Sequence, residues 1–162
     1  FARGIRDQLN THRISANMLA FEIEETALIL NPTRVRETLS ELHHIGVTLT
    51  VRNFGSAHGG SIGWIGGAVS PISDVKISRR HILDMPNNQH YFTYVQALID
   101  VAHALKLKVG ADGVESEAIW SELKTLGCDY AIGYFLSRPL PADEFTRWYR
   151  RTSQVTYLHR HR

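Results

Sequence analysis

The chain has 162 residues, of which 43% are hydrophobic and 21% charged, and its formal net charge is +2. This composition predicts one soluble globular domain with its own core. The net charge is too small, and the basic residues too scattered, to indicate a nucleic-acid-binding protein. Cys128 is the only cysteine, which excludes a disulfide framework and favours a reducing, cytoplasmic compartment. No apolar run in the sequence is long enough to span a membrane.

Five short apolar segments predict β-strands, and helical patterns alternate with them. The strands are expected at residues 18–23, 48–51, 74–77, 108–111 and 129–132. Helices are expected at 1–10, from the Asn31 cap and Pro32 to Gly46, at about 91–107, from the Ser116 cap to Gly127, and from about Pro141. The glycine-rich segment 56–71 predicts no long helix. This alternation predicts an α/β fold with a parallel sheet.

The segment 46–55 contains the predicted central strand. Thr48 to Val51 is a β-branched run between two glycines, typical of a parallel strand covered on both faces. Arg52 and Asn53 follow it, at the strand end where a parallel sheet places its functional groups. Other charged residues also stand at strand ends, and their convergence favours a closed eight-stranded barrel over an open doubly wound sheet. Only five of the eight strands are found.

Successive motifs in the chain resemble the signatures of the EAL domain, a bacterial family of cyclic di-GMP phosphodiesterases. The motifs are Phe21-Glu-Ile-Glu-Glu25, the segment 46–55, Val75-Lys-Ile77, Ala111-Asp-Gly-Val-Glu115, Leu126-Gly-Cys-Asp129, Ile132-Gly-Tyr134 and Ser137-Arg-Pro139. The resemblance extends over about residues 14–145, in order and at nearly family spacing. It implies a TIM-like (β/α)8 barrel of EAL type, of which this chain holds about the last five βα units.

The resemblance also implies hydrolysis of one phosphodiester bond of cyclic di-GMP, with two Mg²⁺ or Mn²⁺ ions held by carboxylates. By position, Glu22 matches a metal-binding glutamate and Lys76 matches the lysine near the nucleophilic water. Asp112 occupies a catalytic and metal-binding position, and Asn53 a metal-binding position. The positions expected to contact the nucleotide are Arg52, Lys76, Arg138 and Pro139.

Several departures from the family pattern predict that catalysis is lost. The pair Arg52-Asn53 replaces the Asp-Asp pair that binds the metals, and Asp112 replaces a glutamate. Ile132 replaces a glutamine, and Ser78 replaces the aspartate of a Lys-Ile-Asp motif. The run Gly55-Ser-Ala-His58 differs from the family's Gly-Thr-Gly-Tyr loop, and the Glu-Ala-Leu motif and the asparagine ligand are absent from this chain. We therefore expect no cofactor, or Mg²⁺ or Mn²⁺ if the chain is active.

Simpler structural roles stand beside these functional ones. Glu22 alone fits a structural ion pair, and Lys76 on a buried strand needs either an internal carboxylate or a phosphate as its partner. Cys128 fits core packing. The nine histidines show no metal-ligand spacing and are expected at the surface or in loops. Turns that need permissive backbone angles are expected at three glycines, Gly55, Gly113 and Gly133.

The sequence thus predicts the C-terminal part of a degenerate EAL domain at residues 1–150 and a basic tail at 151–162. Its first residue is Phe1 rather than Met, which is typical of an excised piece. The expected function is a catalytically inactive module of cyclic di-GMP signalling that senses the nucleotide or binds a protein. The alternative is an active metal-dependent cyclic di-GMP phosphodiesterase, and a third interpretation is a structural remnant.

Two structural expectations follow. Arg52 should replace the metals as the cation at the barrel mouth and pair with Glu22 or Asp112, which leaves Lys76 as a spare cation for a phosphate. Five strands cannot close an eight-stranded barrel, so the edge near residues 18–23 or 130–132 should be covered. A second copy of the chain or another part of the parent protein could cover it.

Overall fold

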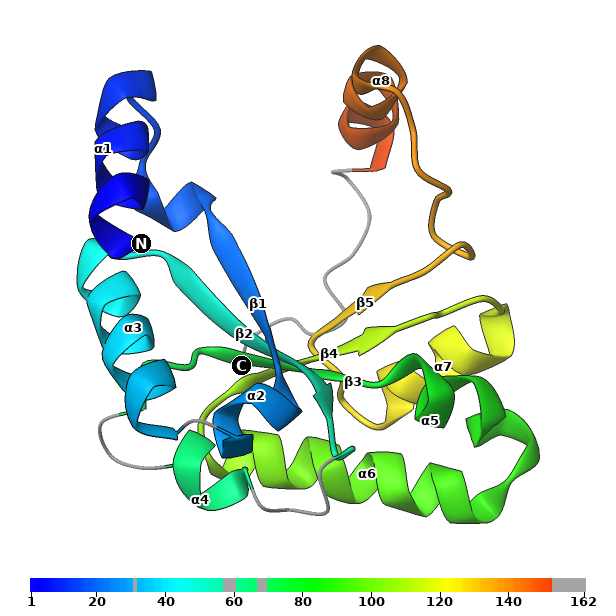
Figure 1. Ribbon diagram of the computed structural model, residues 1–162. Helices are drawn as coiled ribbons and strands as arrows, with labels where there is room; N and C mark the ends of the chain where they lie inside the picture. The colour runs from blue at the N-terminus through cyan, green and yellow to red at the C-terminus, as the bar shows by residue number, and fades with distance from the viewer. Residues whose placement is uncertain (31, 57–60, 67–69, 153–162) are drawn as a thin grey trace. The chain divides into compact units, whose positions relative to one another are not determined.

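The computed structural model describes residues 1–30, 32–56, 61–66 and 70–152 (Figure 1). The strands are β1 (Ala20–Glu24), β2 (Thr48–Phe54), β3 (Asp74–Ile77), β4 (Lys108–Asp112) and β5 (Tyr130–Ile132). They are hydrogen-bonded in chain order. β1 runs parallel to β2, and β4 runs parallel to β5. The predicted α/β fold with five strands is confirmed.

The helices are α1 (Ala2–His12), α2 (Glu25–Leu30), α3 (Pro32–Ile45), α4 (Ile62–Ile65), α5 (Arg79–Asp84), α6 (Gln89–Ala104), α7 (Glu117–Thr125) and α8 (Ala142–Thr152), with 3-10 turns η1 (Ala16–Met18) and η2 (Met85–Asn87). Ser116 caps α7 as predicted, since its hydroxyl accepts a hydrogen bond from the Ile119 amide at 3.3 Å. Sequence analysis missed α2, α4 and α5, which have only six, four and six residues. Six residues or fewer make less than two helical turns, which is too short for a periodic pattern.

Some sequence-based expectations concern residues that the structure leaves undescribed. They are the Asn31 cap, His58 in the glycine-rich segment, and residues 153–162 of the basic tail. Within the described ranges, no helix combines the length and apolar character that a bilayer crossing requires.

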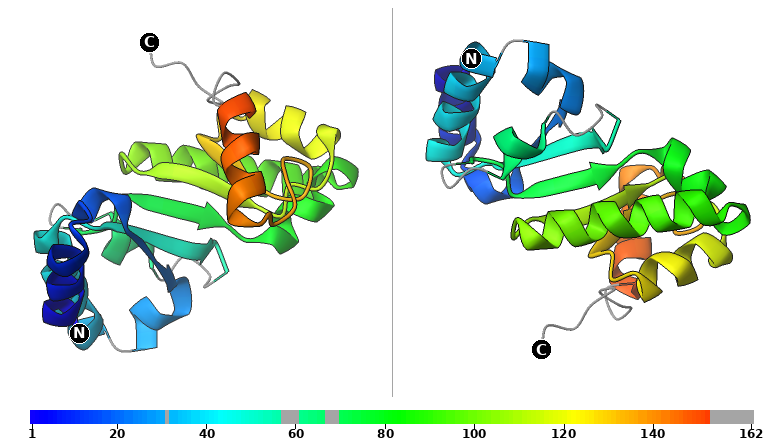
Figure 2. Two further views of the ribbon diagram at one scale, coloured as in Figure 1. Left: turned by 90° about the horizontal axis from the view of Figure 1, so that it is seen from above. Right: turned by 90° about the horizontal axis from the view of Figure 1, so that it is seen from below.

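The chain divides into two compact units, which are described separately. The first comprises residues 1–76 and 101–108. In it α1 and α3 lie side by side, and α3 contacts β2 (Figures 1 and 2). Leu39 and Leu42 of α3 and Leu49 and Val51 of β2 are buried, and each such side chain contributes roughly 1.5–3 kcal/mol. Because side chains alternate along a strand, Arg52 leaves β2 on the face opposite to Leu49 and Val51.

The second unit comprises residues 77–100 and 109–162. Its core includes Ile82, Val109 and Leu123, each fully buried. Cys128 is also fully buried, with its Sγ 3.4 Å from the Val109 carbonyl oxygen and 3.3 Å from that of Tyr130. Burial raises the pKa of this thiol to about 12, which keeps it protonated and inert. The expected packing role of Cys128 is therefore confirmed.

The glycines that follow the strands meet two different requirements. Gly55 and Gly113 have φ of 91° and 80°, in the region that side chains disfavour, as predicted. Gly133 does not have a positive φ. A Cβ atom at Gly133 would instead overlap the backbone N, C and O atoms of Val114, so close backbone approach is what requires glycine there.

His81 on α5 is a buried titratable group of the second unit. His81 is 5% exposed, and neither nitrogen of its ring has a hydrogen-bond partner. The ring packs against two aromatic rings of α6, with centroid distances of 5.0 Å to Tyr94 and 5.8 Å to Tyr91. Burial lowers the pKa of His81, and the positive charge of Arg80 lowers it further, whereas Asp84 raises it. The expectation that the histidines lie at the surface or in loops is wrong for His81.

We predict that His81 makes the fold sensitive to acid. Because folding lowers the pKa of His81, the unfolded chain binds more protons below a pH of about 6.5, and stability falls as the pH falls. Between the two pKa values this loss approaches about 1.4 kcal/mol per pH unit.

The substitution His81→Phe should flatten this dependence in urea unfolding curves between pH 5 and about 7.5. His12→Phe, at an exposed position of α1, is the matched control and should keep the original pH dependence. Equal pH profiles for the wild-type chain and His81→Phe would contradict the assignment.

Candidate functional site

Glu22 and Lys76 form an ion pair on one face of the first unit. Glu22 of β1 is paired with Thr50 of β2, and β2 lies between β1 and β3. Neighbouring strands are about 4.8 Å apart, so the long Lys76 side chain must cross β2 to reach the carboxylate. Its Nζ lies 2.6 Å from Glu22 Oε1, and the two side chains are 6% and 44% exposed. The predicted internal ion pair of Lys76 is confirmed, and its prediction as a spare cation is wrong.

Glu24 binds Arg52 and Asn53, the two residues that the sequence predicts in place of a metal-binding aspartate pair. The parallel register aligns Glu24 with Arg52, so both side chains leave the sheet on the same face. Arg52 Nε lies 2.9 Å from Glu24 Oε1. Asn53 Nδ2 donates to Glu24 Oε2 at 2.7 Å. One carboxylate therefore binds a donor on each of its oxygens.

This geometry corrects the expected partner of Arg52. The sequence predicts an ion pair of Arg52 with Glu22 or Asp112, whereas the structure shows the ion pair of Arg52 with Glu24. The carboxylate of Glu22 is bound by Lys76 instead. The physical reason is the strand register, because Glu24 lies directly opposite Arg52 whereas Glu22 lies two residues earlier, opposite Thr50.

The backbone after Arg52 is fixed by a tight turn. Asn53 has φ of 58°, a left-handed conformation that asparagine tolerates better than most residues. The Ser56 amide donates to the Asn53 carbonyl oxygen at 3.0 Å, and this bond closes the turn. The buried Glu25 carboxylate accepts a hydrogen bond from the Ser61 hydroxyl. The end of β1 is thus tied to the segment that follows β2.

The remaining predicted positions belong to the second unit. Asp112 ends β4 and is half-buried, and Arg138 and Pro139 are exposed in the segment after β5. The Arg138 guanidinium lies 5.2 Å from the centre of the Tyr134 ring, within the range of a cation–π contact. Another ion pair in this unit joins Arg79 Nη2 to Glu115 Oε1 at 2.5 Å.

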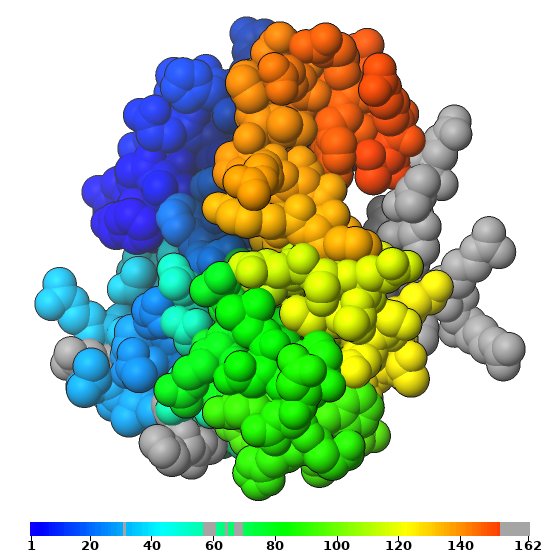
Figure 3. All heavy atoms as spheres, turned by 90° about the vertical axis from the view of Figure 1, so that its right-hand side faces the viewer, coloured from blue at the N-terminus to red at the C-terminus, as the bar shows by residue number. Residues whose placement is uncertain are grey.

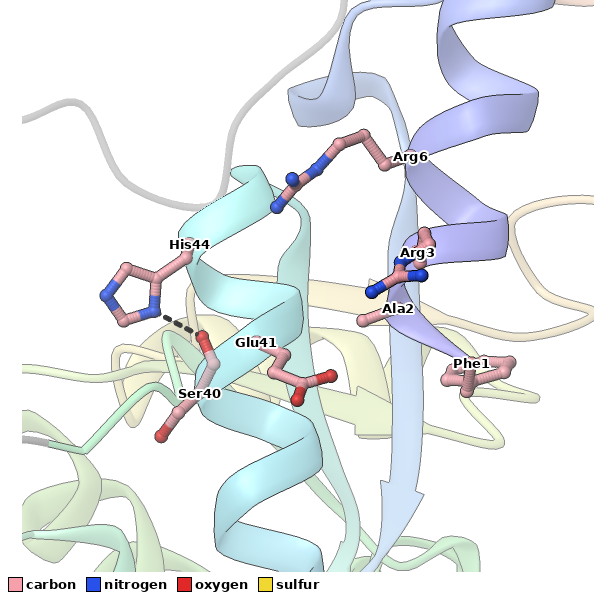
Figure 4. A pocket seen from close by; sticks show the side chains of 7 residues that line it. All are labelled: Phe1, Ala2, Arg3, Arg6, Ser40, Glu41 and His44. Atoms are coloured by element: carbon pink, nitrogen blue, oxygen red, sulfur yellow. Dashed lines mark hydrogen bonds between the residues drawn. The ribbon is translucent and has the colours of Figure 1, made fainter.

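A surface cavity of about 820 Å³ lies between α1 and α3 of the first unit. Arg3 and Arg6 line it from α1, and Glu41 and His44 line it from α3 (Figure 4). The Nδ1 atom of His44 lies 2.6 Å from the Ser40 carbonyl oxygen. None of the motif residues lines this cavity, so it does not belong to the predicted site.

The donor set at the strand ends of the first unit does not fit a pair of divalent metals. Mg²⁺ and Mn²⁺ prefer carboxylate and water oxygens. Glu22 is bound to Lys76, and Glu24 is bound to Arg52 and Asn53. Across the described part of the chain, no three His, Cys, Asp or Glu side chains are grouped so that they could hold an ion. The cations and the amide of the chain neutralise these carboxylates instead.

Glu24 is a residue of this cluster that the sequence does not predict. The expected strand ended at residue 23, whereas β1 extends to Glu24. A period of two along the strand would have placed Glu24 on the face of Glu22 and Arg52. That alternation was the available signal, and a one-residue error in the strand end concealed it.

We predict that Glu22→Gln destabilises the fold by roughly 1–3 kcal/mol, because it removes the charge from a carboxylate that binds the buried ammonium of Lys76. Urea unfolding at pH 7 measures this change. The control Glu37→Gln, at an exposed position of α3, should change stability by less than about 0.5 kcal/mol. A Glu22→Gln chain as stable as the control would contradict a supporting role for the pair.

Comparison with known proteins places these motifs in a family. The model of the EAL domain matches residues 1–139. The chain is 34% identical over 149 residues to the cyclic di-GMP phosphodiesterase NbdA of Pseudomonas aeruginosa and 28% identical over 145 residues to the oxygen sensor protein DosP of Escherichia coli. These alignments include 90% and 89% of this chain. It spans only 19% and 18% of the two relatives' lengths.

Solved structures agree with this match. The PaMucR phosphodiesterase in complex with c-di-GMP has a TM-score of 0.81 and 28% identity, over 87% of this chain and 56% of that chain. The EAL domain of Mycobacterium smegmatis DcpA has a TM-score of 0.81 and 26% identity, over 93% and 66%. The fold is thus part of a TIM-like barrel of EAL type. The chain belongs to the EAL domain family.

Proposed function

We propose that this chain acts in cyclic di-GMP signalling as a non-catalytic module that binds the nucleotide without a metal ion. The observation that carries the proposal is the ion pair between Arg52 and Glu24, at the position where the family pattern has metal-binding aspartates. The family match and the c-di-GMP complex of PaMucR phosphodiesterase support the choice of ligand.

Electrostatics supports the loss of hydrolysis. A unit positive charge and a divalent ion about 4 Å apart repel by about 8 kcal/mol at an effective dielectric constant near 20. A metal bound beside Arg52 would have to overcome this repulsion, and Asn53 offers only a neutral oxygen. Its amide group already donates to Glu24.

An active metal-dependent cyclic di-GMP phosphodiesterase is the second candidate function. The similarity to NbdA favours it, as does the presence of Glu22, Lys76 and Asp112 at or near their family positions. Its weakness is the chemistry of Glu22, because the ammonium of Lys76 binds one of its carboxylate oxygens and would repel a metal ion there.

Protein binding through an open sheet edge is a further part of the proposal. β1 and β5 are the outer strands of the sheet order. Apolar side chains are exposed near each of them, with Met18 79% exposed in the first unit and Ile132 48% exposed in the second. In the second unit α8, orange to red in Figure 3, lies at the surface. Its Phe145 and Tyr149 are 49% and 58% exposed. A second copy or another part of the parent protein would cover such edges.

We predict that the chain does not convert cyclic di-GMP to linear di-GMP in the presence of Mn²⁺, as measured by chromatography of the products.

The double substitution Arg52→Asp, Asn53→Asp should raise the affinity for Mn²⁺ because two carboxylates replace a cation and an amide. Calorimetric titration with Mn²⁺ measures this.

The control is Arg34→Asp with Asn10→Asp, which makes the same change in net charge at exposed helix positions and should leave Mn²⁺ affinity unchanged. The proposal is wrong if the unmodified chain produces linear di-GMP with Mn²⁺ and Glu22→Ala abolishes that production.

A further inference from the structure

The carboxylate of Glu24 occupies a pair of donors in the way that a phosphate would. Its two oxygens accept separately from Arg52 Nε at 2.9 Å and from Asn53 Nδ2 at 2.7 Å. Phosphate and carboxylate share this requirement, since guanidinium and amide donors bind two oxygens of either group. The donors come from consecutive residues of β2, so the backbone keeps the two side chains adjacent.

The backbone that carries the donor pair is held in place independently of Glu24. Asn53 lies in a left-handed turn with φ of 58°, closed by the bond from the Ser56 amide to the Asn53 carbonyl oxygen. Phe54, the next residue, is 1% exposed and anchors the strand end in the core. Removal of the Glu24 carboxylate would therefore leave Arg52 and Asn53 at the same strand end.

The ion pair is exposed enough to open. The side chains of Arg52 and Glu24 are 47% and 45% exposed. Exposed pairs of this kind are weak, so the open form is a substantial fraction of the population. The neighbouring Lys76 side chain is only 6% exposed and stays with Glu22. Of the two cations, Arg52 is therefore the one that can exchange its carboxylate for another anion.

We propose that Glu24 is the internal occupant of a phosphate-binding site and competes with the phosphodiester of the nucleotide for Arg52 and Asn53. This inference rests on the proposed function for the identity of the nucleotide, whereas the anion site itself rests on the geometry. Binding requires the Glu24 carboxylate to turn away. Only chains in which the pair is open can bind the phosphate. The apparent affinity is therefore the intrinsic affinity multiplied by the open fraction.

The test is the substitution Glu24→Gln, which keeps the shape of the side chain and removes its charge. Cyclic di-GMP and inorganic phosphate are titrated separately by calorimetry in EDTA. Release of the self-competition should lower the dissociation constant about two- to sixfold, as expected for removal of a weak exposed pair. Arg52→Gln should weaken binding of the same ligand at least about tenfold, since it removes the charged donor.

Glu37→Gln, at an exposed position of α3, makes the same charge change and should leave both affinities unaltered. A second readout needs no variant: the NMR signal of Arg52 Nε–H in the unmodified chain should shift as phosphate displaces Glu24. This measurement decides the matter if Glu24→Gln does not fold.

The outcomes separate the two proposals. Tighter binding of both ligands by Glu24→Gln supports both, and tighter binding of phosphate alone supports the anion site while it contradicts the proposed nucleotide. Unchanged or weaker binding of phosphate by Glu24→Gln, or an Arg52 signal that phosphate does not shift, overturns the inference. Cyclic di-GMP binding that Arg52→Gln leaves intact also overturns it, with the proposed function still standing.

Discussion

The parallel register of β1 and β2 is the constraint on which the chemistry of this chain depends. It aligns Glu24 with Arg52 and Glu22 with Thr50, so two carboxylates emerge from one face of the sheet at successive levels. Each then meets a different cation, Lys76 across the neighbouring strand and Arg52 beside it. A shift of one residue in this register would turn both carboxylates to the opposite face.

Carboxylates gathered at the end of a parallel sheet need positive charge nearby, because like charges in proximity disfavour the ionised form. In a two-metal phosphodiesterase the ions supply that charge. Here the chain supplies it through its own side chains. The second unit follows the same rule, with Glu115 paired to Arg79. Under the proposed function, Arg52 and Asn53 in place of an aspartate pair would change the counter-ion as well as remove ligands.

The order of strands and most long helices could be predicted from local patterns, since apolar periodicity, caps and glycine stops act over a few residues. The Ser116 cap and the bounds of β3 are examples. The partner of Arg52 could not be predicted in this way, because it depends on the register between β1 and β2 and on one residue at the end of β1. The reason for glycine at position 133 is also non-local, because a side chain there would overlap the backbone of Val114. His81 was missed because nothing in its sequence neighbours reveals burial.

The central claim is that internal cations replace metal ions at the strand ends, so that any nucleotide binding is independent of metal. Calorimetric titration of the chain with cyclic di-GMP, once in EDTA and once in excess Mn²⁺, tests this most directly. We expect cyclic di-GMP to bind in EDTA with a dissociation constant that Mn²⁺ leaves unchanged. Binding that appears only with Mn²⁺, or that tightens at least about tenfold with it, would contradict the account.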